Sequence, residues 1–233
     1  MKTKPILLTL TVFALFSCGS LRNTTMADCA VAEVLEATTQ VASSTSATFD
    51  EGVVINGVRW ATRNVDAPGT FAPYPESSGM LFQWNRKKAW NTTDKEVEGW
   101  DNSIPEGTKW YAENDPCPEG WRVPTYNELQ SLFDTGRGMG RQWYFIPSTG
   151  VRAIRFFDRN KRPIIDYSIF LRIVGYRDSR FGTFHTETIL GSGYWSSTRS
   201  NAQDAKRLTV HNDDAYVNDS DTRFGFSIRC VAK

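Results

Sequence analysis

The sequence predicts an α+β domain over residues 51–233, with antiparallel β-structure, one main helix and long loops. Three observations lead to this prediction. A β-hairpin pattern surrounds Asn56-Gly57, a capped helix pattern covers residues 125–133, and residues 85–114 show no sustained periodicity. The chain has 233 residues, 40% of them hydrophobic, which is enough for one well-buried domain of ordinary size.

The first predicted element is the hairpin. Asn56 and Gly57 separate two short runs rich in β-branched and aromatic residues, Val53–Ile55 and Val58–Trp60. Because Asn-Gly supplies the two positive φ values of a type I′ turn, these runs are predicted to pair. A segment rich in Pro and Gly follows and leads to a predicted short strand over residues 80–84.

A long loop is predicted next, over residues 85–114. It carries Trp90, Trp100, Trp110 and Tyr111 among polar residues. These rings have two possible roles, since they could pack on the domain or form a platform that faces a ligand. Under the second interpretation, Trp90, Trp100 and Tyr111 are the candidate ligand-binding residues.

A rigid turn and a short helix follow the loop. Two prolines flank Cys117 in the turn, and an extended segment then runs up to Pro124. Thr125 is the predicted N-cap, and Glu128 completes a capping box three residues later. The apolar stripe and the predicted stop of this helix are Leu129, Leu132, Phe133 and Gly136.

Strands are predicted after the helix, over residues 143–147 and 150–157, and a polar turn at 158–163 precedes a second long strand or strand pair at 164–176. The strands on either side of this turn are predicted to form a hairpin. Within residues 151–180, three acids offset eight cations, which are Arg152, Arg155, Arg159, Lys161, Arg162, Arg172, Arg177 and Arg180. This basic hairpin is either a docking patch for an anionic polymer or a protein, or a solvated face.

The last part of the chain is predicted to be β-structure. A short strand follows the bend at 191–193, another strand covers 205–211, and a turn at 212–214 leads to a return strand. Residues 224–231 are expected to close the sheet. Strand alternation in this segment predicts Phe226, Ile228 and Cys230 inward and Arg229 outward.

The N-terminus is predicted to be a targeting segment. Two lysines precede an apolar run that is too short to span a bilayer and ends in LFSC, which is similar to a bacterial lipobox. This pattern predicts a signal peptide over residues 1–17 and diacylglyceryl attachment to Cys18, and the alternative is an ordinary signal peptide with an incidental cysteine. Residues 18–50 are predicted to be a flexible tether, in which Cys29 is a free thiol or forms an intermolecular disulfide.

Long motifs carry a resemblance to a known family. They are DPCPEGWRVPTYNEL from Asp115, GSGYWSST at 191–198 and RFGFSIRCV at 223–231, and VVINGVRWATRNV at 53–65 resembles the usual opening of the same domain. The chain is therefore similar to the Fibrobacter succinogenes major paralogous domain family. The resemblance implies a C-type-lectin-like fold in an envelope protein of Bacteroidetes-type bacteria. It implies no substrate, because the family has no well-defined shared activity.

The two cysteines of the domain are Cys117 and Cys230. An exported chain meets an oxidising compartment, which favours a disulfide between them. C-type-lectin-like domains have a similar long-range bridge from the first helix region to the final strand. The competing hypothesis is a metal site, but neither His185 nor His211 stands at a zinc-ligand spacing from a cysteine.

Calcium is the one cofactor with any basis in the sequence. Asp213, Asp214, Asp219 and Asp221 lie in a segment rich in acids and amides, and Ca²⁺ prefers such oxygen ligands. The same residues also suit two tight turns, and the E-P-N and W-N-D motifs of lectin calcium sites are absent from the sequence. The sequence therefore predicts no cofactor, with calcium as a weak alternative.

The sequence favours a binding protein over an enzyme. A net charge of +1 gives no argument for nucleic acid, and no G-x-S-x-G motif or phosphate-binding loop is present. We expect a lipid-anchored outer-membrane protein, on the periplasmic face or the cell surface, that presents loops to a glycan or to an envelope or surface protein. One alternative is a structural or adhesin subunit of a surface assembly, which predicts an exposed edge strand or apolar patch. The other is an envelope enzyme acting on polysaccharide, which predicts a pocket with two carboxylates or a histidine.

Overall fold

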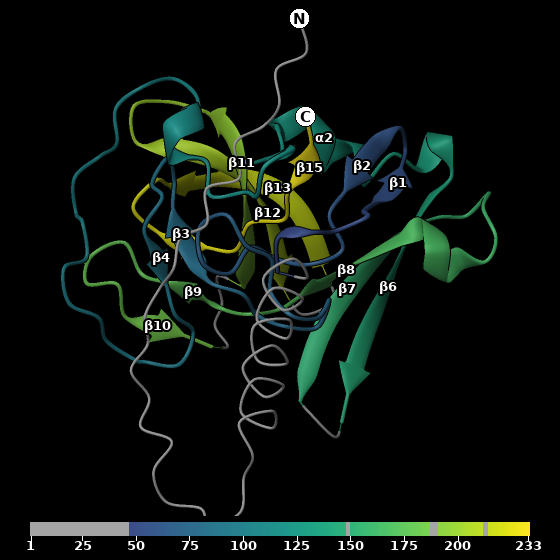
Figure 1. Cartoon of the computed structure of the whole chain (residues 1–233), viewed down its shortest axis with the longest axis horizontal. Helices are drawn as coiled ribbons and strands as arrows, with labels where there is room; N and C mark the ends of the chain where they lie inside the picture. Colours follow the sequence, from purple (N-terminus) through teal and green to yellow (C-terminus); the bar gives the residue numbers. More distant parts are fainter. Residues whose placement is uncertain (1–46, 148–149, 187–190, 212–213) are drawn as a thin grey trace, which may run out of the picture. The chain divides into compact units, whose positions relative to one another are not determined.

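The computed structural model describes residues 47–147, 150–186, 191–211 and 214–233, all within one compact unit (Figure 1). Cys18, Cys29 and Asp213 lie outside the described residues. The described chain folds mostly into antiparallel β-structure, in four small sheets with one short α-helix. This is the predicted combination of antiparallel strands, a single helix and long loops.

The first sheet joins the two ends of the domain. Its order is β1-β2-β15-β5, and the strands are β1 (Val53–Ile55), β2 (Val58–Trp60), β15 (Val231–Ala232) and β5 (Trp121–Arg122). The hairpin between β1 and β2 is the predicted one, and Asn56 and Gly57 have the positive φ angles, 49° and 80°, that its turn requires. Since β15 pairs with both β2 and β5, the last strand connects the hairpin to the turn before the helix.

Two three-stranded sheets contribute to the first core cluster. One contains β6 (Met139–Ile146), β7 (Val151–Asp158) and β8 (Ser168–Arg172), and the other contains β11 (Ser192–Arg199), β12 (Asp204–His211) and β13 (Asp214–Asp221). Buried side chains of both sheets meet those of the first hairpin and of α2 (Tyr126–Ser131) in this cluster. The free end of the β6–β7 hairpin extends away from the other sheets (Figure 1).

The fourth sheet is built from very short strands. Its order is β10-β9-β14-β3-β4, and the strands are β10 (Phe184–His185), β9 (Tyr176–Arg177), β14 (Gly225–Phe226), β3 (Leu81–Gln83) and β4 (Ala89–Trp90). A second core cluster includes Trp84, Trp195, Phe226 and Cys230. Three 3₁₀ turns lie in the connections, namely η1 (Ala112–Asn114), η2 (Thr135–Arg137) and η3 (Ile164–Tyr167).

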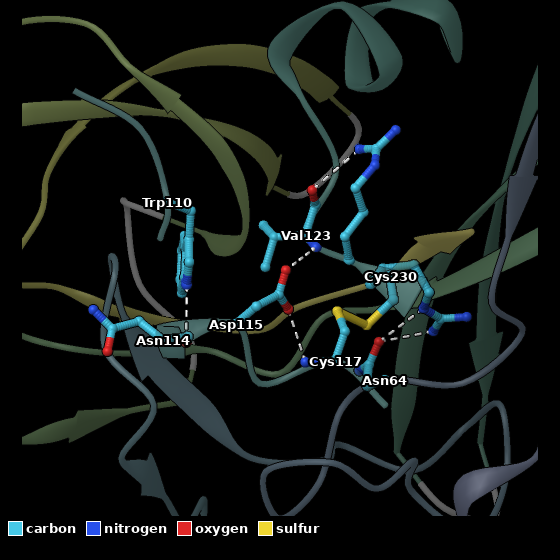
Figure 2. Close-up of a disulfide and its surroundings, with 9 residues drawn as sticks. Asn64, Trp110, Asn114, Asp115, Cys117, Val123 and Cys230 are labelled. Atoms are coloured by element: carbon cyan, nitrogen blue, oxygen red, sulfur yellow. Dashed lines mark hydrogen bonds between the residues drawn. A yellow bond between two sulfur atoms is a disulfide. The ribbon is translucent and has the colours of Figure 1, made fainter. Parts of the chain in front are cut away.

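The predicted disulfide between Cys117 and Cys230 is present (Figure 2). The two Cα atoms lie 6.1 Å apart, and the cysteines are separated by 113 positions in the sequence. The carboxylate of Asp115 holds the turn in place, because it accepts the backbone N–H of Cys117 at 2.9 Å and of Val123 at 3.1 Å (Figure 2). Burial, partly offset by these hydrogen bonds, raises the pKa of Asp115.

The capping box predicted for α2 is confirmed. The hydroxyl of Thr125 accepts the backbone N–H of Glu128, and the carboxylate of Glu128 accepts the backbone N–H of Thr125 at 2.7 Å. The same carboxylate accepts two hydrogen bonds from Arg122, at 2.6 and 2.8 Å. Leu129 and Leu132 are buried in the first core cluster, as their spacing predicted.

The predicted end of the helix is wrong. α2 ends at Ser131, and Gly136 lies inside the 3₁₀ turn η2 rather than at a helix terminus. Asp134 starts that separate turn, because its carboxylate accepts the backbone N–H of Arg137 at 3.2 Å. The left-handed residue that ends it is Gly138, with φ of 85°.

Residues 164–176, predicted to be a long strand or a strand pair, contain the 3₁₀ turn η3, the strand β8 and the start of the strand β9. η3 comes first, β8 then pairs with β7 to form the predicted hairpin, and β9 joins the fourth sheet. Gly175 has a φ of 103°, which an extended strand does not allow. Ser192 holds this break, because its hydroxyl accepts the backbone N–H of Val174 at 2.9 Å.

The predicted alternation of inward and outward side chains over residues 224–231 is wrong at Arg229. Phe226, Ile228 and Cys230 are buried as predicted, but Arg229 is also buried, with 1% of its surface exposed. Strand alternation fails at this position because residues 228–230 lie between β14 and β15 and belong to neither strand. The guanidinium of Arg229 donates to the side-chain oxygen of Asn64 at 2.8 and 3.0 Å.

Candidate functional site

Two buried amides hold the long loop after β3 against the domain. The side chain of Gln83 donates to the carbonyl oxygen of Asp101 at 2.7 Å. Asn85 donates to the carbonyl oxygen of Glu106 at 3.2 Å and accepts the backbone N–H of Tyr111 at 2.7 Å. The middle and the end of the loop are therefore both fixed to Gln83, the last residue of β3, and to Asn85 just after it.

Two of the four loop aromatics are buried. Trp90 is 5% exposed and Trp110 is 7% exposed, whereas Trp100 and Tyr111 are half-buried. The indole N–H of Trp110 donates to the carbonyl oxygen of Asn114 at 2.9 Å (Figure 2), and its ring packs against Trp84 at 5.7 Å. Of the two roles predicted for these rings, Trp90 and Trp110 therefore have the first, since they pack on the domain.

Trp100 anchors the middle of the loop. Its ring lies 4.9 Å from the ring of Trp90, centroid to centroid. The backbones of Gly182 and Gly225 approach the same ring so closely that a Cβ atom would come within 2.4 Å and 3.0 Å of it, respectively. Trp100 therefore packs the loop onto two other segments of the domain.

An open pocket of about 350 Å³ lies beside the first part of this loop. Its walls are formed by Gln83, Asn85, Arg86, Lys87, Lys88, Trp90, Gly99, Asp101 and Asn114. Of the three candidate ligand-binding residues, Trp90 lines the pocket. Trp100 does not line it, but its ring packs against the ring of Trp90. Tyr111 is not among the lining residues, and its hydroxyl lies against the backbone of Gly107.

One ion pair forms part of the pocket wall. Arg86 donates to the carboxylate of Asp101, and its other terminal nitrogen donates to the carbonyl and hydroxyl oxygens of Ser103, each at 2.8 Å. Burial is the largest influence on Asp101 and raises its pKa, but hydrogen bonds from Ser103 and the charge of Arg86 together lower the pKa below its ordinary value. Asp101 is therefore ionised at neutral pH.

A lysine and two buried N–H groups also belong to the pocket walls. The ammonium of Lys88 stands 4.0 Å from the ring centroid of Trp90. Two wall residues have a buried side-chain nitrogen without a hydrogen-bond partner, the Nε of Arg86 and the indole nitrogen of Trp90. Other described residues outside the pocket, among them Trp60 and Arg155, have such nitrogens as well.

The walls suit the binding of a polar ligand with negative charge. Arg86, Lys87 and Lys88 supply three cations, and Asp101, the one carboxylate in the walls, is already paired with Arg86. The ring of Trp90 adds an apolar surface. The side-chain amides of the walls, those of Gln83, Asn85 and Asn114, add uncharged hydrogen-bonding groups. The enzyme alternative requires a pocket with two carboxylates or a histidine. This pocket holds neither, whereas another open pocket, of about 610 Å³, is lined by Asp50, Glu51 and Asp166.

Comparisons with protein-family models, with curated proteins and with solved structures found no match. The resemblance to the Fibrobacter succinogenes major paralogous domain therefore stays a prediction. No helix among the described residues is long and apolar enough to cross a membrane.

Two of the described carboxylates of the calcium alternative are paired with cations. Asp219 pairs with Lys206 at 2.7 Å, and Asp221 pairs with Arg223. Asp214 lies five residues before Asp219 on β13, which places it roughly 16 Å away along the strand. These three carboxylates therefore do not form one site, and Asp213 lies outside the described residues. Across the described ranges there is no group of three or more His, Cys, Asp or Glu that could hold a metal.

The basic hairpin is not a single solvated face. Arg177 is fully buried, and its guanidinium donates to the carbonyl oxygens of Asn91, Asp94 and Gly182. Arg155 is half-buried, with its guanidinium 4.6 Å from the ring centroid of Tyr144. The exposed members of the set are Arg152, Arg159, Lys161, Arg162 and Arg180.

The sequence interpretation missed the polar residues of the pocket. The run Arg86-Lys87-Lys88 stands four to two positions before Trp90, and this adjacency of cations and an aromatic ring was a usable sequence pattern. Nothing in the sequence marks Asp101 as the partner of Arg86. Their contact depends on the fold of the loop between them.

Proposed function

We propose that this chain is a lipid-anchored outer-membrane protein whose domain binds an acidic glycan without catalysing a reaction. The observation that carries the proposal is the pocket beside the long loop, whose walls combine three cations with Trp90, one of them, Lys88, standing over the ring of Trp90. The proposal narrows the expected ligand from glycans in general to glycans that carry carboxylate or sulfate groups.

The charge of the pocket supports an acidic ligand. Lys87 and Lys88 are exposed, while Arg86 is occupied by Asp101 and Ser103. The two lysines are therefore the cations that a ligand would meet, and charge-assisted hydrogen bonds to a carboxylate or sulfate are stronger than neutral ones. A polysaccharide also offers hydroxyl groups to the amides of the walls.

The fold supports a C-type-lectin-like domain. It has short antiparallel strands, one capped helix and a long loop, and its disulfide ties the turn before the helix to the last segment of the chain. This is the long-range bridge that the family resemblance implies. A fold alone does not set a ligand, so the pocket rather than the fold carries the functional part of the proposal.

A glycan array tests the binding proposal. Residues 43–233, which form one compact unit, are screened against acidic and neutral glycans at low and high salt. We expect saturable binding to acidic glycans that weakens with salt, because exposed charges are screened. Lys88→Glu should weaken binding by about tenfold or more, equivalent to about 1.4 kcal/mol.

Lys161→Glu is the matched control, since it reverses an exposed lysine outside the pocket and should leave binding unchanged. A blank array at both salt concentrations would exclude the glycan part of the proposal. Binding to neutral glycans that is insensitive to salt and to Lys88→Glu would exclude the acidic ligand and this pocket.

The lipid anchor is tested separately. Cells are fed an alkyne-labelled fatty acid, and the labelled protein is followed in membrane fractions. We expect Cys18→Ser to remove both the label and the retention in the membrane fraction. Persistent labelling of the Cys18→Ser protein would contradict the assignment.

A further inference from the structure

β6 is an eight-residue strand at the edge of its sheet, and among the described strands it pairs on one side only, with β7 (Figure 1). It has eight residues and pairs with β7 in continuous register, from Met139 opposite Asp158 to Ile146 opposite Val151, without a bulge. Among the described residues, no strand pairs with its other side. Every second backbone N–H and C=O group over residues 141–145 therefore points outward from the sheet.

The other eight-residue edge strands are protected. β11 is covered, since the backbone N–H of Trp195 donates to the carbonyl oxygen of Ser227 at 3.0 Å, and that of Ser197 to Pro124 at 2.7 Å. β13 carries acidic residues at both ends, Asp214, Asp219 and Asp221, which discourage pairing with another strand. β6 contains one charged residue, Arg141, and no proline, and its run from Gln142 to Phe145 is uncharged and rich in aromatic residues.

We propose that β6 pairs with β6 of a second copy of this chain, antiparallel and about a two-fold axis at Tyr144. The two three-stranded sheets then become one continuous sheet. The proposal is independent of glycan binding and concerns a different surface. A two-fold interface closes on itself, so it produces a dimer and not a filament. It also gives a use to the exposed edge strand that the surface-assembly alternative called for.

The register follows from the side chains. In an antiparallel pair about a two-fold axis normal to the sheet, residues opposite each other lie on the same face. Centring the axis on Tyr144 places this residue opposite its own copy and Trp143 opposite Phe145 of the second copy. Aromatic pairs of this kind stabilise neighbouring strands. Arg141 falls opposite Pro147 in this register, so the two copies of Arg141 do not face each other.

The surroundings of β6 are compatible with this pairing. Phe145 is 58% exposed, and Trp143 and Tyr144 are half-buried. The nearest cations are engaged within their own copy. Arg155 donates to the side-chain oxygen of Gln142 at 2.9 Å, and Arg141 donates to the carbonyl oxygen of Ala215 at 3.1 Å. These contacts lower the electrostatic cost of bringing two basic hairpins together.

Disulfide cross-linking of the full chain tests the register. Cys18→Ser and Cys29→Ser are introduced first, so that the two remaining cysteines, Cys117 and Cys230, are both in the disulfide. Tyr144→Cys is then added, and the protein is oxidised mildly in detergent. Opposite residues of an antiparallel pair have Cα atoms about 4.5–5.5 Å apart, within the range that a disulfide spans. We expect a cross-linked species of twice the mass of the monomer that disappears on reduction.

Phe181→Cys is the matched control, because Phe181 is 64% exposed and lies outside β6. It should give no cross-linked dimer. A mixture of Trp143→Cys and Phe145→Cys proteins should cross-link more efficiently than either protein alone, because these positions face each other in the proposed register.

An edge-blocking variant provides a second measurement. Phe145→Lys adds a charge beside the axis at an exposed position and should convert the dimer to a monomer, whereas Phe181→Lys should leave it dimeric. Monomeric starting protein together with no Tyr144→Cys link would overturn the proposal. So would a link between Tyr144→Cys and Tyr216→Cys proteins without a Tyr144→Cys self-link, since that result means head-to-tail pairing of β6 with β13.

Discussion

Arg177 and Arg229 stabilise this domain from inside. Both are buried, and each donates mainly to backbone carbonyl oxygens, those of Asn91, Asp94 and Gly182 for Arg177. Burial lowers the pKa of both guanidinium groups from the ordinary value, although each remains charged at neutral pH. A buried cation is tolerated only when its donors are satisfied, so each arginine fixes the loops that supply those oxygens.

Arg229→Ala should strongly destabilise the protein. The change leaves the side-chain oxygen of Asn64 and the carbonyl oxygens of Ala61, Thr62 and Phe170 without their buried donor. We expect the free energy of unfolding to fall by about 3–5 kcal/mol, the usual cost of breaking a buried charged network. Urea denaturation followed by tryptophan fluorescence measures the loss.

Arg59→Ala is the control for this prediction. Arg59 is exposed and donates to the carbonyl oxygen of Glu51, so its removal should cost less than about 0.5 kcal/mol. Equal urea midpoints for the two variants would show that the Arg229 network contributes little to stability.

Helix α2 is the element that the sequence predicted in most detail. Its capping box depends on Thr125 and Glu128, three residues apart, and the first hairpin depends on the adjacent residues Asn56 and Gly57. Such contacts are local, so the sequence contains nearly all the information that sets them. The stop of α2 was missed because Asp134 offers the backbone a different hydrogen bond only two residues after the C-cap.

The elements that were missed depend on distant contacts. Arg229 is buried because Asn64 and Phe170, both far away in the sequence, surround its guanidinium. The pocket likewise exists because Gln83 and Asn85 hold the middle and the end of the long loop. The run Arg86-Lys87-Lys88 before Trp90 is the one part of the pocket that a sequence pattern indicates. The burial of Arg229 and the approach of Asp101 to Arg86 have no periodic pattern or short motif, so they could not be predicted.

The capping box gives α2 a defined dependence on pH. Burial is the largest influence on Glu128 and raises its pKa, but hydrogen bonds from Arg122 and Thr125 outweigh it and the pKa is lowered. A carboxyl group with a depressed pKa stabilises the folded state fully above its unfolded pKa of about 4.3. This contribution is lost as the pH falls from there through the lower pKa of the folded state.

Glu128→Gln should therefore be less stable than the parent near neutral pH, by about 1.5–3 kcal/mol, since hydrogen bonds to a charged group are lost. The difference should shrink as the pH falls below about 4. Urea midpoints measured at both pH values check this. Glu119→Gln changes an exposed acid in the turn that precedes β5 and α2. Its urea midpoint should equal that of the parent at both pH values. If the stability difference between Glu128→Gln and the parent stays constant with pH, the charge of Glu128 is not what stabilises the helix.

At the scale of the whole molecule, no single sheet holds the domain together. The first and fourth sheets are made of strands of two or three residues, and such strands are marginal by themselves. The buried residues form two core clusters, and Cys230 belongs to the second. The disulfide encloses α2 and both three-stranded sheets between Cys117 and Cys230, so it restricts most of the domain.

The disulfide should therefore be the largest single contributor to stability that one chemical change can remove. A closed loop with a sequence separation of 113 predicts a loss of about 4–5 kcal/mol on the chain-entropy argument. We expect Cys117→Ser combined with Cys230→Ser to lower the urea midpoint accordingly. Adding dithiothreitol should lower the midpoint of the parent to that of the double variant and should not affect the variant itself.

The pocket provides the matching functional measurement. Its walls come from residues 83–114, which precede Cys117 and so lie outside the closed loop. Under conditions where the double variant is still folded, its glycan affinity should therefore equal that of the parent, although its stability is much lower. A large loss of affinity in folded double variant would show that the disulfide also positions the pocket. A loss of less than about 1 kcal/mol in stability would contradict the chain-entropy argument for this domain.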